Sequence, residues 1–244
     1  YLPFPPAVHD RPVQASTSRF LPYYSFAHLP RVGLVEFKVS GIVLAGGMSS
    51  RLGQPKQLLE LGGRPVLQYV LDAATRGGLE EIVVVLGHAA TRVSSAIRLP
   101  AGARCVVNPD FATGQASSLA SGLRAVSPEA RAALILLGDQ PRVGADTIRS
   151  IVEAYRRSGA LVVQARYRGT PGHPVLLDRG VWAQVEAVEG DRGARDLLAS
   201  HPEWMHRVDV DAELPADIDT WEDYERLQRG EGRSSSRPPP NTRP

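Results

Sequence analysis

Short apolar runs alternate with longer amphipathic segments through the middle of the chain. The short runs are rich in Val, Ile and Leu, which is typical of buried strands, and they predict strands at 40–44, 81–86, 104–107, 132–137, 161–166, 174–177 and 206–210. Apolar residues at helical spacing predict helices near 65–77, 89–98, 116–126, 145–158, 180–188, 193–200 and 220–228. This alternation indicates an α/β fold in which helices flank a Rossmann-like, mostly parallel sheet.

The two ends of the chain lack this alternation. Residues 1–37 are rich in Pro and aromatic residues and lack the layout of a secretory signal, so we expect an unstructured or non-native N-terminal extension. Residues 230–244 are polar and Pro-rich, which does not offset the entropy of ordering, so we expect a disordered tail there. A single domain is therefore predicted over 38–229.

Composition excludes several classes of protein. Of the 244 residues, 43% are hydrophobic and 22% are charged, as in ordinary globular proteins, and the apolar runs fall far short of the ~20 residues of a membrane helix. The net charge of +2 without a basic stripe in the core sequence argues against a nucleic-acid partner, and the short runs argue against a membrane. A single cysteine, Cys105, rules out an intrachain disulfide and a thiolate metal cluster, which fits a cytoplasmic protein.

A glycine-rich segment follows the first predicted strand directly. Residues 44–56 are L-A-G-G-M-S-S-R-L-G-Q-P-K, and the backbone N–H groups of such a turn can approach a polyphosphate while Arg51 and Lys56 supply positive charge. The alternative is a plain glycine turn with solvated basic residues. The spacing matches neither G-x-G-x-x-G nor G-x-x-x-x-G-K-[ST], which argues against dinucleotide oxidoreductases and P-loop NTPases.

Two acidic segments offer carboxylates for a cation. The strand 132–137 continues into G-D-Q-P, which places Asp139 at the carboxyl edge where open α/β sheets bind ligands; the alternative is an Asp that only caps a turn. Magnesium prefers one or two carboxylates with phosphate oxygens and water, and the segment 216–224, A-D-I-D-T-W-E-D-Y, can supply the second. In that segment Thr220 also fits a helix N-cap with Asp223 as its partner.

Residues 44–56 resemble the L-A-G-G-x-S-x-R-x-G-x-x-K signature of the MobA-like nucleotidyltransferases at every defined position. The resemblance extends over about 40–228 and implies a nucleotidyltransferase domain over 38–229 with a fold of the nucleotide-diphospho-sugar transferase type. It implies that the glycine-rich loop embraces a triphosphate whose phosphates are bound by Lys56. The nucleotide-binding residues that it implies are Leu44, Ala45, Gly46, Gly47, Arg51, Lys56, Asn108, Gly114, Ser117, Ser118 and Asp139.

Other segments extend the resemblance. Residues 108–119 resemble the family's N-P-x-x-x-x-G-x-x-x-S-L element, which lines the nucleotide pocket, although serines at a helix start often serve only as caps. In related transferases the Asp before Thr in a D-x-D-T-x-x-D stretch reaches the metal. The resemblance therefore implies Asp139 and Asp219 as metal ligands, with Mg²⁺ as the cofactor and Mn²⁺ as an alternative, and Lys56, Arg51 and Asp139 as catalytic residues.

The flanks of these motifs resemble the molybdopterin cytidylyltransferase branch of the family. Pro55 precedes Lys56, where the guanylyltransferase branch more often carries Asp. Two further segments resemble the G-x-P-x-H-P and G-D-x-G-A-R elements on the acceptor side, and the acceptor-binding residues that they imply are His173, Asp191, Gly193 and Arg195. For His173, the alternative of a turn histidine that only hydrogen-bonds the backbone has at least equal weight.

The resemblance implies magnesium-dependent transfer of CMP from CTP to the molybdopterin cofactor, which releases pyrophosphate and forms molybdopterin cytosine dinucleotide. The implied partners are CTP, the molybdopterin cofactor and a molybdoenzyme of the xanthine dehydrogenase type that receives the product. The alternatives are guanylyl transfer to molybdopterin, nucleotidyl transfer to a sugar or polyol phosphate, and a non-catalytic, nucleotide-binding cofactor chaperone. The preference for cytosine rests on the resemblance alone.

Overall fold

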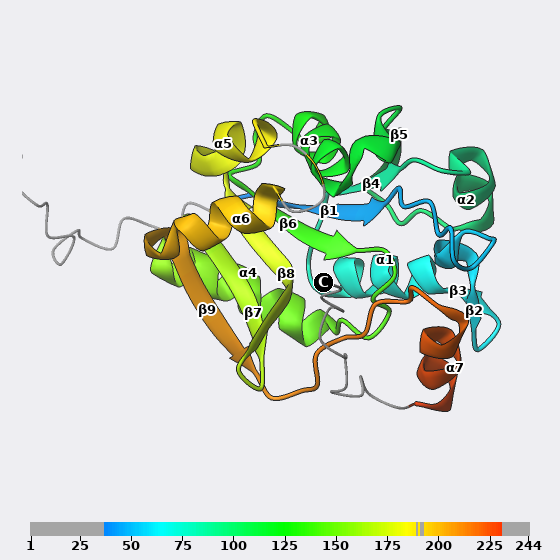
Figure 1. Cartoon of the computed structure of the whole chain (residues 1–244). Helices are drawn as coiled ribbons and strands as arrows, with labels where there is room; N and C mark the ends of the chain where they lie inside the picture. Colours follow the sequence, from blue (N-terminus) through cyan, green and yellow to red (C-terminus); the bar gives the residue numbers. More distant parts are fainter. Residues whose placement is uncertain (1–36, 189, 191–192, 231–244) are drawn as a thin grey trace, which may run out of the picture. The chain divides into compact units, whose positions relative to one another are not determined.

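The computed structural model describes residues 37–188, 190 and 193–230 (Figure 1). Apart from Phe37 and Gly230, the predicted N-terminal extension and C-terminal tail lie outside these residues, as does the predicted acceptor residue Asp191. Within the described residues, no helix is long and apolar enough to cross a membrane.

A seven-stranded sheet forms the centre of the domain. Its strands are β1 (Val39–Ala45), β4 (Ile82–Leu86), β5 (Ala103–Val107), β6 (Ala132–Leu137), β7 (Val162–Tyr167), β8 (Thr170–Asp178) and β9 (Met205–Val210). Their order across the sheet is β5-β4-β1-β6-β8-β7-β9. Strand β8 runs antiparallel to β6 and β7, and all other neighbours in this sheet pair in parallel. The prediction of a mostly parallel sheet is confirmed.

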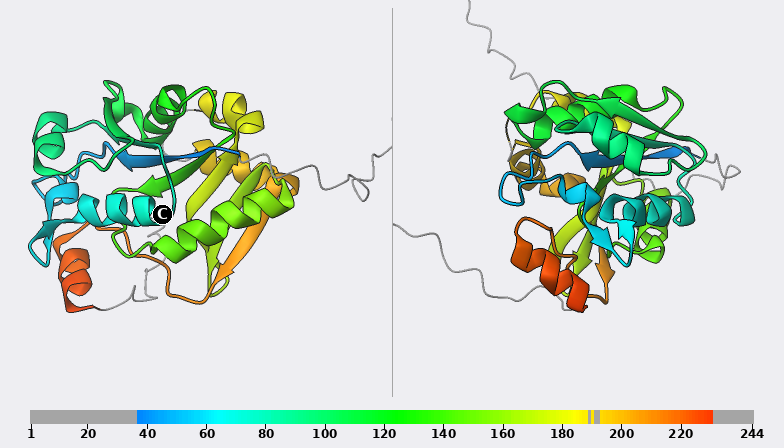
Figure 2. Two further views of the ribbon diagram at one scale, coloured as in Figure 1. Left: turned by 180° about the vertical axis from the view of Figure 1, so that it is seen from behind. Right: turned by 90° about the vertical axis from the view of Figure 1, so that its right-hand side faces the viewer.

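Seven α-helices accompany the described strands, close to the predicted positions. They are α1 (Val66–Arg76), α2 (Ala90–Ala96), α3 (Gln115–Ala125), α4 (Ala145–Ser158), α5 (Trp182–Glu186), α6 (Gly193–Ser200) and α7 (Trp221–Arg229). Apolar residues of α1, α2 and α4 join one core cluster, whereas those of α3, α5 and α6 join a second. The ribbon views show these two groups of helices on opposite faces of the sheet (Figures 1 and 2).

Two local features depart from the apolar pattern. Strand β8 begins at Thr170 rather than at 174, because pairing with Ala165–Tyr167 extends the Pro- and Gly-containing start of the strand. A small hairpin of β2 (Glu60–Leu61) and β3 (Arg64–Pro65) turns at Gly62 and Gly63, which both have positive φ. Strands of two residues are too short to produce a periodic pattern.

The order of the strands places two loops side by side at the carboxyl edge of the sheet. After β1 the chain moves outward to β4 and β5, and it then returns to β6 on the other side of β1. In open α/β sheets, ligands bind outside the carboxyl ends of the strands at such a reversal. The glycine-rich loop after β1 and the turn after β6 therefore lie side by side at the expected position of a site.

Helix α3 approaches the sheet closely at Gly122. A Cβ atom there would lie 2.6 Å from Ile42 Cγ2 and 3.1 Å from Val85 Cγ2, and both of these side chains are fully buried. We expect Gly122→Ala to lower the free energy of unfolding by about 1–2 kcal/mol, because overpacking outweighs the gain in helix propensity. Urea denaturation measures this change. Ser121→Ala, at the partly exposed neighbouring position, should shift stability by less than about 0.5 kcal/mol, and equal stabilities of the two variants would contradict the packing argument.

Candidate active site

A cavity of about 510 Å³ opens at the carboxyl ends of β1 and β6. Its walls come from the glycine-rich loop, the turn after β6, the segment before α3, the start of β8, α6 and the segment before α7. The predicted site residues that line it are Leu44, Gly46, Gly47, Lys56, Gly114, Ser118, Asp139, His173, Arg195 and Asp219. Segments far apart in the sequence thus meet in one cavity.

The glycine-rich loop is fixed by bonds within itself and to its neighbours. Ser49 has a left-handed φ of 51°, and its Oγ accepts a hydrogen bond from the backbone N–H of Lys56 at 3.0 Å. The side chain of Gln57 donates to the Ala45 carbonyl at 2.8 Å. At Gly46, an added Cβ would lie 3.3 Å from the backbone nitrogen of Gly87, so only glycine permits this approach without displacing the neighbour. These contacts fix the backbone at Lys56, from which its side chain extends into the cavity.

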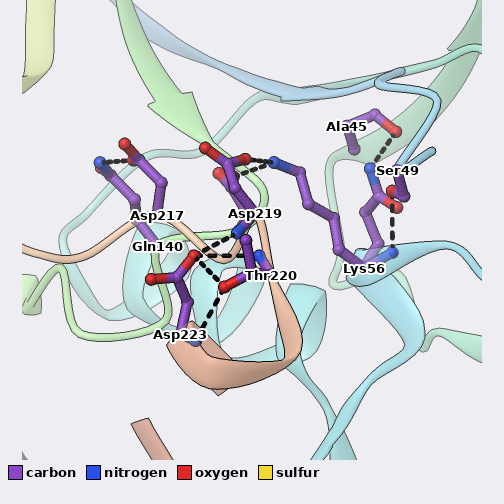
Figure 3. A network of polar contacts seen from close by, with 10 residues as sticks. Ala45, Ser49, Lys56, Gln140, Asp217, Asp219, Thr220 and Asp223 are labelled. Carbon is purple, nitrogen blue, oxygen red and sulfur yellow. Dashed lines mark hydrogen bonds and ion pairs between the residues drawn. The ribbon is translucent and has the colours of Figure 1, made fainter. Parts of the chain in front are cut away.

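The Lys56 ammonium lies between two carboxylates (Figure 3). Its Nζ is 2.5 Å from Asp139 Oδ2 and 2.9 Å from Asp219 Oδ1. The side chains of Lys56 and Asp139 are 17% and 10% exposed, whereas that of Asp219 is 53% exposed. Both carboxylates therefore face one point, at the border between the buried base of the cavity and solvent.

Burial and charge act in opposite directions on this group. Burial lowers the pKa of Lys56, but its contacts with Asp139 and Asp219 outweigh burial and raise that pKa above its ordinary value. Burial raises the pKa of Asp139, the Lys56 ammonium opposes this rise, and the charge of Asp217 adds to it. Lys56 is therefore a cation at neutral pH, and it balances the buried carboxylate beside it.

Several polar residues of the cavity were missing from the sequence-based prediction, among them Gln57, Gln140 and Asp217. Gln57 and Gln140 follow Lys56 and Asp139 directly, and Asp217 lies two residues before Asp219; all three line the cavity. Gln140 donates to Asp217 Oδ1 at 2.7 Å, and its buried Oε1 lacks a hydrogen-bond partner among the described residues. Adjacency to predicted site residues was the sequence feature that could have indicated Gln57 and Gln140, whereas Asp217 is also the first Asp of the D-x-D-T-x-x-D stretch.

Asn108 organises the loop before α3 rather than lining the cavity. It is 2% exposed, its amide donates to the hydroxyls of Ser117 and Ser118, and its Oδ1 accepts from the backbone N–H of Asp110. The N-cap of α3 is Gly114, without a side-chain cap. Of the two serines, Ser118 lines the cavity and Ser117 does not.

Of the remaining predicted residues, two line the cavity, and Gly193, Ala45 and Arg51 do not. His173 and Arg195 line the cavity from β8 and α6, and burial lowers the pKa of His173, which favours its neutral form. Its Nδ1 lies 3.4 Å from the carbonyl oxygen of Ile135. Gly193 is the first residue of α6. Ala45 and Arg51 do not line the cavity; Ala45 is buried and Arg51 is exposed.

The mostly parallel sheet, with a cavity at its carboxyl edge, has the nucleotide-diphospho-sugar transferase fold that solved nucleotidyltransferases share. The MobA-like NTP transferase domain matches residues 41–205, and the chain belongs to this family.

Named relatives carry different activities. Nicotine blue oxidoreductase of Paenarthrobacter nicotinovorans is 32% identical, over 78% of this chain and 96% of that protein. The molybdenum cofactor cytidylyltransferase of Escherichia coli is 28% identical, over 75% of this chain and 92% of that protein. The similarity therefore establishes the family and leaves the substrates open.

A solved structure shares the fold over nearly its whole length. The crystal structure of Rv0371c from Mycobacterium tuberculosis H37Rv has a TM-score of 0.73 at 36% identity, covering 79% of this chain and 98% of that one. A complex of Rv0371c with manganese has a TM-score of 0.69 at 32% identity, with the same coverage.

The structure predicts that Asn108 contributes mainly to stability. Asn108→Ala removes three hydrogen bonds around a buried position, and we expect the free energy of unfolding to fall by about 1–3 kcal/mol in urea denaturation. Thr113→Ala, which removes one exposed hydrogen bond in the same loop, should change it by less than about 0.5 kcal/mol. An Asn108→Ala variant as stable as the wild type would contradict this role.

Proposed function

We propose that this protein transfers CMP from CTP to the molybdopterin cofactor, releasing pyrophosphate and forming molybdopterin cytosine dinucleotide. The observation that carries the proposal is the Lys56 ammonium between Asp139 and Asp219, beside the glycine-rich loop and inside the cavity. Backbone N–H groups and a cation suit the phosphates of a triphosphate, and the two carboxylates suit the metal ion that accompanies it.

The choice of CTP and molybdopterin has separate support. The E. coli relative that spans most of this chain is a molybdenum cofactor cytidylyltransferase. Pro55 before Lys56 resembles that branch, and so do the segments that bring His173 and Arg195 to the cavity wall. The proposal includes a cytoplasmic location and delivery of the product to a molybdoenzyme of the xanthine dehydrogenase type.

Asp139 and Asp219 are the residues that would hold a divalent cation. The described residues contain no group of three or more His, Cys, Asp or Glu side chains suited to a metal. Two carboxylates facing one point nevertheless fit Mg²⁺, which takes its other ligands from phosphates and water. Mn²⁺ is a second candidate, because Rv0371c forms a complex with manganese. When bound, the cation would neutralise charge on the triphosphate.

The residues of the chain would act by position and charge. A terminal phosphate oxygen of molybdopterin forms a bond to the α-phosphorus of CTP, the bond from that phosphorus to the bridging oxygen breaks, and pyrophosphate leaves. The attacking phosphate is already ionised, so a general base is not needed, which agrees with a neutral His173. Lys56, with Arg51 assigned by resemblance, would stabilise the phosphate charge, and the backbone of Gly46 and Gly47 would hold the triphosphate.

Pyrophosphate release tests the reaction. With Mg²⁺ and molybdopterin, we expect release from CTP and much less from GTP, and Asp139→Asn should cut turnover by roughly 10²-fold or more. Release from GTP instead would assign guanylyl transfer. Lack of release from either nucleotide would reject molybdopterin as the acceptor, and a sugar phosphate or polyol phosphate would then be tested. An Asp139→Asn variant with wild-type turnover would remove Asp139 from the mechanism.

Lys56 and the proposed cation compete for the same carboxylates. Lys56→Met should therefore strengthen Mn²⁺ binding to nucleotide-free protein by roughly tenfold, because it removes a positive charge in contact with both. Electron paramagnetic resonance of free Mn²⁺ measures this affinity. Arg51→Met removes the same charge from an exposed position of the same loop, where solvent screens it. Equal increases in the two variants would show a general charge effect and contradict direct competition.

A further inference from the structure

Part of the cavity comes from a segment outside the region that matches the family domain. That region ends at residue 205, yet Leu214, Pro215, Asp217 and Asp219 all line the cavity. These four residues belong to the connection between β9 and α7. Asp219 therefore reaches Lys56 from a loop, in contrast to Asp139, which lies in the turn directly after the buried strand β6. The loop requires its own support to keep Asp219 in place.

Asp223 supplies that support through a single carboxylate oxygen. Its Oδ2 accepts hydrogen bonds from the backbone N–H of Asp219 at 3.2 Å, from the backbone N–H of Thr220 at 2.9 Å and from the Thr220 hydroxyl at 3.0 Å (Figure 3). The Thr220 Oγ1 in turn accepts from the backbone N–H of Asp223 at 3.2 Å, which completes a capping box at the start of α7.

The bond to Asp219 exceeds what helix capping requires. A capping box needs a bond from the third helical residue to the N-cap N–H, here from Asp223 to Thr220. Asp223 additionally holds the N–H of the preceding residue, which is the residue that carries the carboxylate facing Lys56. Arg226 donates to the other oxygen, Oδ1, and so holds the Asp223 carboxylate in this orientation.

An apolar cluster joins the same segment to the glycine-rich loop. Ile218, 1% exposed, directly precedes Asp219, and it packs with Leu227, Leu52, Leu59 and Val66. Leu52 and Leu59 flank Lys56 in the sequence, so the same cluster anchors both sides of the Lys56–Asp219 contact. The cluster sets the position of the loop as a whole, and Asp223 sets the backbone of Asp219 within it.

We propose that Asp223 is a positioning residue, which orients the Asp219 carboxylate toward the cation site through the backbone N–H groups of Asp219 and Thr220. This inference rests on the proposed function, which makes Asp219 a cation ligand. Residues that orient a metal ligand typically change metal affinity by about 10–100-fold when they are replaced.

Mn²⁺ binding to the full-length, nucleotide-free protein tests the inference, with the melting temperature recorded for each variant. We expect Asp223→Ala to raise the dissociation constant for Mn²⁺ about tenfold. Asp223→Asn keeps an acceptor oxygen for the two backbone N–H groups, so its dissociation constant should return to within about threefold of the wild type. The control is Glu222→Ala, which removes the same charge from an exposed residue of the same turn that takes no part in these bonds. It should change the constant by about twofold or less.

Asp219→Ala separates this inference from the function on which it rests. If Asp219→Ala weakens Mn²⁺ binding and Asp223→Ala lowers only the melting temperature, Asp223 is a structural cap and the positioning role is overturned, while the cation site stands. If Asp219→Ala leaves Mn²⁺ binding unchanged, the assignment of Asp219 as a cation ligand fails, and the role of Asp223 fails with it. If Glu222→Ala weakens binding as much as Asp223→Ala, the effect is one of charge alone and positioning is overturned.

Discussion

The contact of the Lys56 ammonium with Asp139 and Asp219 joins three parts of the chain that are distant in sequence. Charges as little exposed as those of Lys56 and Asp139 are tolerated only when they are paired, since removing one partner leaves an uncompensated buried charge. Each of the three segments must therefore be held accurately. Much of the local structure around the cavity, from the left-handed Ser49 to the capping box of α7, serves to hold one of them.

The sheet provides the fixed frame for this contact. Strands β1, β4 and β6 are almost fully buried between two layers of helices, so the ends of β1 and β6 have little freedom. Asp139 takes its position directly from the end of β6, and Lys56 takes its position from the glycine-rich loop after β1, which Ser49 and Gln57 hold in place. Asp219 lies outside the frame, and its backbone depends on Asp223 and on the apolar contacts of Ile218. The most exposed member of the trio thus depends on contacts of its own loop and of α7.

Sequence patterns predicted the frame well, because parallel strands buried on both faces are continuous apolar runs. They also predicted Lys56, Asp139 and Asp219 through motifs that resemble a family, and the structure brings these three together. The patterns missed the bond from Gln140 to Asp217 and the one from Gln57 to Ala45. Bonds of this kind depend on how loops fold back on each other, and they produce no periodic pattern in the sequence. The start of β8 was missed for a related reason, since pairing with β7 overrides its Pro- and Gly-containing sequence.

Under the proposed function, the groups of the cavity that bind the triphosphate differ from the groups that contact the base and the acceptor. A triphosphate is the same in CTP and GTP, so the glycine-rich loop, Lys56 and the two carboxylates cannot discriminate between bases or between acceptors. Selectivity must come from walls that contact other parts of the substrates, because a fold alone does not determine function. Away from the glycine-rich loop, the walls of the cavity include His173, Arg195 and the bonded pair of Gln140 and Asp217. Relatives that share a fold but differ in their stated activity, such as an oxidoreductase and a cytidylyltransferase, are therefore expected to differ in these walls.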